Sequence, residues 1–198
     1  MSPEIIARGE IYVSIDIEAD GAIPGKSSMI NFGAAFYDNS GTPLNIEYEA
    51  NLEPLPYPAK PDPDTSMWWE KQFQKNPKLK EHLNTNVRDP GIVMHEFVNL
   101  SNRVACQYST QLTPIAYPAG FDWMWMYWYL TYFTTKSPYS FSCLDIKSYA
   151  AAKMKCDYRW AVKRNMPKTW FNKNLKHDHS GLADCRGQAA LFFSMQNV

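Results

Sequence analysis

A strand that ends in two carboxylates constrains this chain more than any other feature of its sequence. Residues 11–17 of IYVSIDIEADG alternate, so that the isoleucines and the valine share one face, whereas Asp16 and Glu18 lie on the other. Residues two apart in a strand are roughly 6–7 Å from each other. Two carboxylates at that separation repel each other unless a cation lies between them or one is protonated. The pattern therefore indicates a strand that holds a metal ion at its end; solvated charges on an edge strand are the alternative.

Length and composition indicate one folded domain over residues 1–198. Of the 198 residues, 45% are hydrophobic and 15% aromatic, which is enough for a sizeable buried core. No signal-peptide pattern opens the sequence, and the most apolar segment, 121–133, is too short to span a bilayer. We therefore expect a cytoplasmic protein with no membrane association. The four cysteines form no CxxC pair or zinc-type spacing, so we expect reduced thiols.

Charge is unevenly distributed along the chain. Residues 1–146 contain 10 Lys and Arg and 17 Asp and Glu, a net charge of −7, whereas residues 147–198 contain 10 and 3, a net charge of +7. The C-terminal third can therefore form a basic surface for a phosphate-bearing partner, or its charges can be dispersed over solvated faces. The candidates for phosphate contact are Lys147, Arg159, Lys163, Arg164 and Lys168.

The order of the expected elements predicts a mixed sheet. Strands at 28–37 and 44–52 follow the first strand after short turns, which predicts an antiparallel meander. Hydrophobic periodicity then predicts helices and one further strand before and after a basic, loop-rich stretch at 155–178. The helices are expected at 66–74, 77–84, 91–105, 120–133, 144–154 and 180–195, and the strand at 112–118. A meander followed by alternating helices and strands implies an α/β fold with helices packed on the sheet.

Three further residues with useful chemistry stand at the edges of expected elements. Asp122 begins a helix just after a strand, His179 lies in the loop before the last helix, and Asp184 lies in the first turns of that helix. Two-metal hydrolysis of a phosphodiester needs a few carboxylates, which Mg²⁺ prefers, and a histidine can accept the proton of the attacking water. Asp122 alone could instead cap its helix, and Asp145 is expected to be a cap. The spacing from His179 to Asp184 is not rare by itself.

The motifs SIDIEADG, YPAGFDW and HSGLADC, in this order, resemble those of the DEDDh 3′–5′ exonucleases. SMINFGAAFYD resembles the second strand of that family, and MWWEKQ and AYPAGFDWMWMYWYL resemble its small exoribonuclease-like group, related to oligoribonuclease and ribonuclease T. The resemblance covers nearly the whole chain. It implies a ribonuclease H-like fold, in which a mixed β-sheet of an antiparallel meander plus parallel strands is flanked by α-helices.

The resemblance also implies a role for each motif residue. Asp16, Glu18 and Asp184 would hold the first of two divalent ions, Mg²⁺ or Mn²⁺, and Asp16 would bridge to the second. Asp122 would complete the acidic set. His179 would be the general base that takes a proton from the attacking water.

Residues near the motifs are candidates for substrate binding. Trp69 and Phe121 could stack on unpaired bases, each contact worth roughly 1–3 kcal/mol, or they could be core residues. The family often has threonines after the motif glutamate, where this chain has Ala19 and Asp20, so the contacts to the terminal nucleotide stay open. The full set of substrate-binding candidates is Ala19, Trp69, Phe121, Lys147 and Arg164.

The expected function is that of a 3′–5′ exonuclease acting on a single-stranded 3′ end, with RNA favoured over DNA, and releasing nucleoside 5′-monophosphates. Two alternatives stay open. One is a catalytically silent ribonuclease H-like module that binds nucleic acid or protein, and the other is a phosphodiesterase that acts on dinucleotides or nucleotide caps. Some members of the family are dimers, so a homodimer is open as well.

Overall fold

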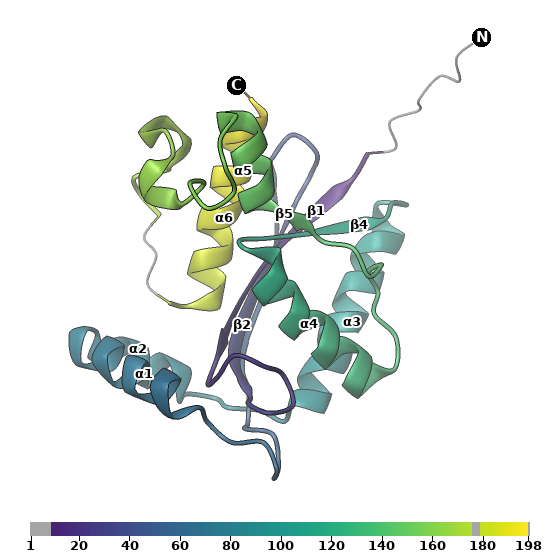
Figure 1. Ribbon diagram of the computed structural model, residues 1–198. Helices are drawn as coiled ribbons and strands as arrows, with labels where there is room; N and C mark the ends of the chain where they lie inside the picture. Colours follow the sequence, from purple (N-terminus) through teal and green to yellow (C-terminus); the bar gives the residue numbers. More distant parts are fainter. Residues whose placement is uncertain (1–8, 176–178, 198) are drawn as a thin grey trace.

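A five-stranded mixed sheet forms the centre of the fold in the computed structural model, which describes residues 9–175 and 179–197 (Figure 1). The strands are β1 (Ile11–Ala19), β2 (Met29–Tyr37), β3 (Pro43–Asn51), β4 (Leu112–Ala116) and β5 (Leu144–Asp145), in the spatial order β3-β2-β1-β4-β5. The pairs β1–β2 and β2–β3 are antiparallel, whereas β1–β4 and β4–β5 are parallel. The predicted fold, an antiparallel meander extended by parallel strands, is therefore confirmed.

Within the described residues, six α-helices and two short 3₁₀ helices surround this sheet. They are α1 (Pro63–Lys75), α2 (Pro77–Leu83), α3 (Pro90–Gln107), α4 (Ala119–Thr134), α5 (Ile146–Met154), η1 (Lys163–Asn165), η2 (Lys168–Trp170) and α6 (Gly181–Gln196). A proline opens each of the first three, where its missing N–H costs no hydrogen bond. Asp62 caps α1 by accepting a hydrogen bond from Thr65 N at 2.9 Å. Asp89 caps α3 in the same way through Ile92 N at 2.9 Å.

The two faces of β1 are buried in two different cores. Val13, Ile15 and Ile17 are at most 3% exposed and belong to the core that includes residues of α3 and α4. The opposite face lies under α6, where the Ser14 hydroxyl donates a hydrogen bond to Cys185 O at 2.7 Å. Figure 1 shows α3 and α4 on one side of the sheet and α5 and α6 on the other. The predicted alternation along β1 is confirmed, and its polar face is covered by a helix.

The element boundaries differ from the sequence prediction mainly near residue 144. The hydrophobic pattern predicts a helix from there, whereas residues 144 and 145 pair with β4 as the short strand β5. Asp145 then caps α5 as predicted, because its side chain accepts a hydrogen bond from Ser148 N at 2.9 Å. In the part of the chain that the structure describes, no helix is both long enough and apolar enough to cross a bilayer.

Candidate active site

Acidic side chains from β1, α4 and α6 meet near the C-terminal end of β1. Asp16 and Glu18 come from the strand, and Asp122 comes from the first turn of α4. One ligand atom from each of Glu18, His179 and Asp184 lies within 4.8 Å of the other two. The structure thus brings together residues that are more than 160 positions apart in the sequence.

His179 is fixed by the backbone as well as by its ring. Its φ of 63° lies in the left-handed region, which is uncommon for a residue with a side chain. Its backbone N–H donates to Asp184 Oδ2 at 3.1 Å, and its Nδ1 lies 3.6 Å from Glu18 Oε1. The ring meets Trp68 edge-on, with ring centroids 5.0 Å apart. The imidazole is therefore held at the acidic cluster, where a protonated ring would be stabilised by Glu18.

Asp122 is a buried carboxylate, and among the described residues only one of its two oxygens accepts a hydrogen bond. It is 4% exposed, and its Oδ1 accepts a hydrogen bond from Ile17 N at 3.3 Å. Its Oδ2 is buried and has no hydrogen-bond partner among the described residues. Burial and the nearby Glu18 carboxylate raise the pKa of Asp122 well above its ordinary value, although the hydrogen bond from Ile17 opposes this. The N-cap of α4 is Pro118, and the Asp122 side chain bonds to β1, so the alternative that Asp122 caps its helix is not what the structure shows.

Asp16 contacts a residue that the sequence motifs do not include. Gln188 Nε2 donates a hydrogen bond to Asp16 Oδ1, while Gln188 Oε1 is buried without a partner in the described structure. Burial, followed by the charges of Asp122, Glu18 and Asp184, raises the pKa of Asp16 well above its ordinary value. Gln188 lies four residues after Asp184, which puts both side chains on one face of α6. This spacing is the signal by which Gln188 could have been found.

The residues of this cluster fit a divalent cation. Burial and the charges of neighbouring carboxylates raise the pKa values of Asp16 and Asp122, and a cation bound between these side chains would favour their ionised forms. In the part of the chain that the structure describes, Asp122 Oδ2 is a buried oxygen with no hydrogen-bond partner, of the kind that Mg²⁺ or Mn²⁺ takes as a ligand. The residues that could hold a divalent cation here are Asp16, Glu18, Asp122 and Asp184, with His179 beside them.

Two strand residues hold the start of α6, and so place His179 and Asp184. Ser180 stands at the N-cap but makes no side-chain capping bond of its own. Instead, Asn31 Oδ1 accepts from Gly181 N at 2.9 Å, and Glu49 Oε1 accepts from Ser180 Oγ at 3.2 Å. Asn31, which is fully buried, is fixed in turn by its bond to Asn51 at 2.7 Å. No local sequence signal identifies these caps, because they come from β2 and β3.

A glycine pair allows α6 to approach β2. Gly33 pairs with Asp16 across the β1–β2 ladder. A β-carbon added at Gly33 would lie 2.2 Å from both Gly181 C and Leu182 N, closer than real contacts permit. The backbones therefore touch directly beside Asp16, which brings the first turns of α6 to the carboxylates of β1.

The predicted aromatic residues differ in exposure. Trp69 is 5% exposed, and its Nε1 donates to Ala19 O at 2.9 Å, so this pair joins α1 to the end of β1. Trp68 is 39% exposed and lies against His179, and Phe121 is 36% exposed beside Asp122. Trp68 is thus an exposed ring in contact with His179, and Phe121 is an exposed ring next to Asp122 in the sequence. Trp69 is instead buried, and its hydrogen bond to Ala19 O fixes α1 against the end of β1.

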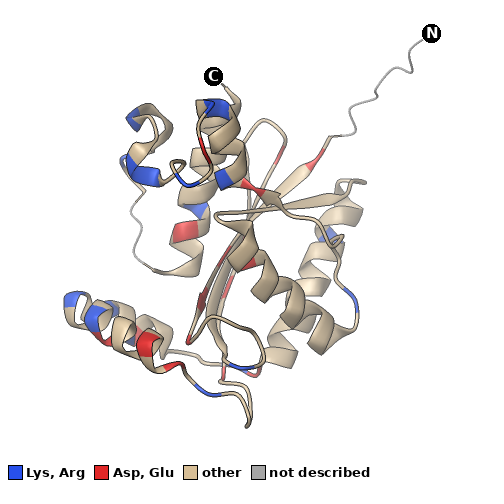
Figure 2. Cartoon of the chain, in the orientation of Figure 1, with Lys and Arg blue, Asp and Glu red and all other residues tan. Residues whose placement is uncertain are grey.

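Basic residues gather over α5 and the two 3₁₀ helices, and a second group lies on α1 and α2 (Figure 2). Lys147 Nζ packs over the Tyr158 ring at 4.3 Å, and Arg164 is exposed in η1. Lys163 lies nearer the carboxylates, since it lines the same cavity as Asp184. The C-terminal third thus supplies a cation to the site, although the basic surface is not confined to that third.

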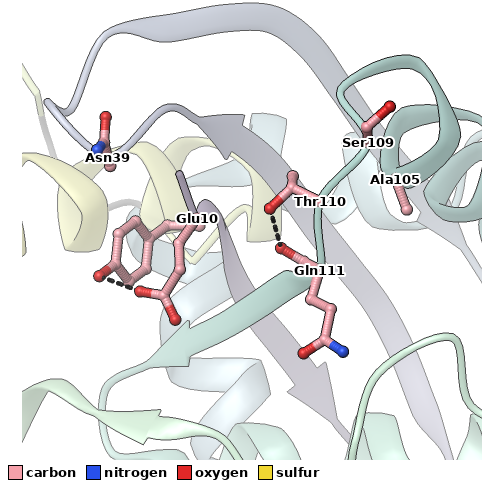
Figure 3. A pocket seen from close by; sticks show the side chains of 7 residues that line it. Glu10, Asn39, Ala105, Ser109, Thr110 and Gln111 are labelled. Carbon is pink, nitrogen blue, oxygen red and sulfur yellow. Dashed lines mark hydrogen bonds between the residues drawn. The ribbon is translucent and has the colours of Figure 1, made fainter. Parts of the chain in front are cut away.

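A separate open hollow of 670 Å³ lies at the other end of β1, lined by residues that include Glu10, Tyr12 and Gln111. There the Tyr12 hydroxyl donates to Glu10 Oε2 at 2.7 Å (Figure 3). Because β1 runs from residue 11 to residue 19, this hollow and the carboxylates at the end of the strand are distinct places. The concentration of ionisable groups marks the carboxylate end as the candidate active site.

Comparison with known proteins agrees with this geometry. No protein-family model matches the chain. The 3′–5′ DNA exonuclease Cap18 of Escherichia coli is 28% identical over 185 residues, which are 92% of this chain and 90% of that protein. The nuclease domain of 3′hExo, a DEDDh family member bound to rAMP, superposes with a TM-score of 0.65 at 10% identity, covering 96% of this chain and 92% of that one.

Exonuclease I from Methylocaldum szegediense has the same fold at a TM-score of 0.59 and 15% identity, over 96% of this chain and 40% of that longer one. At these low identities, the structural likeness establishes the fold alone, and the sequence relationship to Cap18 adds a shared ancestry along nearly the whole chain. The chain therefore has the fold of the DEDDh 3′–5′ exonucleases and is a sequence relative of a 3′–5′ exonuclease.

Proposed function

We propose that this protein is a metal-dependent 3′–5′ exonuclease that hydrolyses single-stranded nucleic acid to nucleoside 5′-monophosphates, within one domain. The observation that carries this proposal is the convergence of Glu18, His179 and Asp184 within 4.8 Å. Asp16 and Asp122 adjoin this group, and their raised pKa values indicate a site built to receive a cation. The sequence relationship to a 3′–5′ exonuclease supports the same reaction.

Each residue has a distinct task in this reaction. Asp16, Glu18, Asp122 and Asp184 bind the metal, proposed to be two Mg²⁺ or Mn²⁺ ions, which polarise the phosphodiester and activate water when bound. His179 accepts the proton of the attacking water. Glu18 faces its Nδ1 at 3.6 Å and stabilises the imidazolium that results.

The surroundings of the cluster fit an unpaired 3′ end. The exposed rings of Trp68 and Phe121 can stack on bases without reading their sequence. We propose that the buried residues Trp69 and Ala19 support the substrate-binding surface from the interior, because Trp69 Nε1 donates a hydrogen bond to the Ala19 carbonyl. Lys147 and Arg164 are proposed to attract the phosphate backbone further from the cluster.

The choice between RNA and DNA has to be measured. RNA as the favoured substrate is a prediction from the sequence resemblance, as is the finer likeness to oligoribonuclease and ribonuclease T. The relative Cap18 is named a DNA exonuclease, whereas one structural neighbour recognises a histone mRNA stem-loop. Both polymers are therefore tested as substrates.

The test uses 5′-labelled single-stranded RNA and DNA of the same sequence, with Mg²⁺, Mn²⁺ or EDTA. We expect a metal-dependent ladder that shortens from the 3′ end and is absent in Asp16→Ala and Asp184→Ala, while both variants keep the wild-type circular dichroism. Activity that survives in either folded variant would remove the metal-ligand assignment. If neither polymer nor a dinucleotide is cleaved with any metal, the protein is not an exonuclease, and a nucleic-acid or protein-binding module takes its place.

A further inference from the structure

Lys163 is held beside the carboxylate cluster by the turn that precedes it. The Tyr117 hydroxyl donates to Ala161 O at 3.0 Å, which ties this turn to the end of β4. Lys163 Nζ lies 5.2 Å from the centroid of the same tyrosine ring, a cation–π distance. Tyr117 lies between β4 and α4, the helix that carries Asp122, so these contacts connect the Lys163 segment to the chain that leads into that helix.

Lys163 shares a small cavity with one residue of the acidic cluster, Asp184. Lys163 and Asp184 line the same cavity of about 100 Å³, between the segment 163–175 and α6. Of the ion pairs among the described residues, none includes Lys163. The Lys163 ammonium thus lies on an aromatic face, and its side chain lines the same cavity as Asp184.

This arrangement suits a ligand that brings negative charge of its own. When divalent cations neutralise the carboxylates, the attraction between the carboxylates and Lys163 weakens. A phosphate entering the same site then offers oxygens that accept charge-assisted hydrogen bonds from an ammonium. A lysine suits this task, because its three donors sit on a flexible stem that can follow the phosphate through the reaction.

We propose that Lys163 binds the phosphate at the centre of the reaction and stays on the 5′-phosphate of the released nucleotide. This inference rests on the proposed function, since it assigns the phosphate to the carboxylate site. It makes Lys163, rather than the more exposed Arg164 and Lys168, the basic residue that recognises the reacting group. The ligand class is a nucleoside 5′-monophosphate.

The test compares the binding of AMP and dAMP with that of adenosine and deoxyadenosine, by calorimetry in Mn²⁺, so that no bond is broken. In Lys163→Met, the affinity for both monophosphates should fall about 10–100-fold, the effect of losing one charge-assisted hydrogen bond. Nucleoside affinity should be unchanged, and Lys163→Arg should restore part of the loss. Lys153→Met is the matched control and should bind like the wild type, because the Lys153 ammonium likewise lies over a tyrosine ring, 5.9 Å from the centroid of Tyr149, but on α5.

A second readout is metal affinity without a nucleotide. Removal of a nearby cation should tighten Mn²⁺ binding to Lys163→Met, by about twofold to tenfold. Equal monophosphate affinity in Lys163→Met and wild type would overturn the proposal and leave Lys163 as a counter-charge, and so would a wild type that does not distinguish monophosphates from nucleosides. A wild type that binds monophosphates through Lys163 but cleaves no polymer would instead refute the exonuclease function.

Discussion

Gly33→Ala tests whether the contact between β2 and α6 positions the candidate active site. The new β-carbon would lie 2.2 Å from Gly181 C and Leu182 N. Ordinary contact begins at 3.4 Å, so the start of α6 has to move by about 1.2 Å. Both atoms belong to backbone, so no flexible side chain can absorb the shift, and Asp184 moves away from Asp16.

The magnitude follows from this displacement. Misplacing reacting groups by about 1 Å can cost about 100-fold in rate, and overpacking a core costs typically about 1–3 kcal/mol. We therefore expect Gly33→Ala to lose about 100-fold in kcat and about 1–3 kcal/mol in the free energy of unfolding. The shift would also strain the bond from Gly181 N to Asn31, which anchors the helix.

The assay measures single-turnover cleavage with saturating metal, together with urea unfolding of the same samples. Gly187→Ala is the matched stability control, because it adds the same methyl group to α6 where nothing lies within 4 Å of the new β-carbon. That variant should gain up to about 1 kcal/mol from helix propensity. If Gly33→Ala kept both the wild-type rate and the wild-type stability, the close approach could not be what positions Asp184.

Three further predictions concern individual side chains. Burial raises the pKa of Asp122 above its ordinary 3.8. Between these two pKa values, the metal-free folded protein binds more protons than the unfolded chain. Its free energy of unfolding should therefore fall as pH rises from 3.8 through the raised pKa. Asp122→Asn, whose amide oxygen can still accept a hydrogen bond from Ile17 N, should make this fall in stability with pH smaller. Urea unfolding in EDTA from about pH 5 to about pH 8 measures the pH dependence. An unchanged slope in the variant would contradict the raised pKa of Asp122. Gln188→Leu should reduce metal affinity or kcat about 10–100-fold with the fold intact, as expected when the partner that orients a ligand is lost, and titration with Mn²⁺ would reveal a purely structural residue by its unchanged affinity. His179→Ala should slow cleavage by about 10²–10⁴-fold while metal still binds; a rate equal to the wild type would exclude it as the base.

Local patterns in the sequence predicted much of the fold and the main residues of the candidate site. The alternation along residues 11–17 predicts β1 and puts Asp16 and Glu18 on one face, because side chains of a strand alternate whatever lies around them. Short turns predict the antiparallel meander, because parallel neighbours would need long crossover connections. Order and spacing pointed to Asp122, His179 and Asp184, and the structure brings all three to the end of β1.

Tertiary structure decided which side chains support that set. Asn31 and Glu49 cap α6 across separations of 150 and 131 positions, and Gln188 reaches Asp16 across 172. The burial of Trp69 was likewise not readable from its sequence neighbours, since Trp68 beside it is exposed.

The physical reason is that a hydrogen bond or a backbone contact depends on where two elements meet, and the periodicity of one element does not encode this. Gly33 is an example. Its sequence neighbours show only a small residue in a strand, whereas the requirement for glycine arises from the contact with Gly181, which is distant in the sequence. By itself, the sequence determined which chemistry the chain contains and on which elements. Only the packing of α6 on β1 and β2 decided that these groups share one site, with Lys163 and Gln188 at its border.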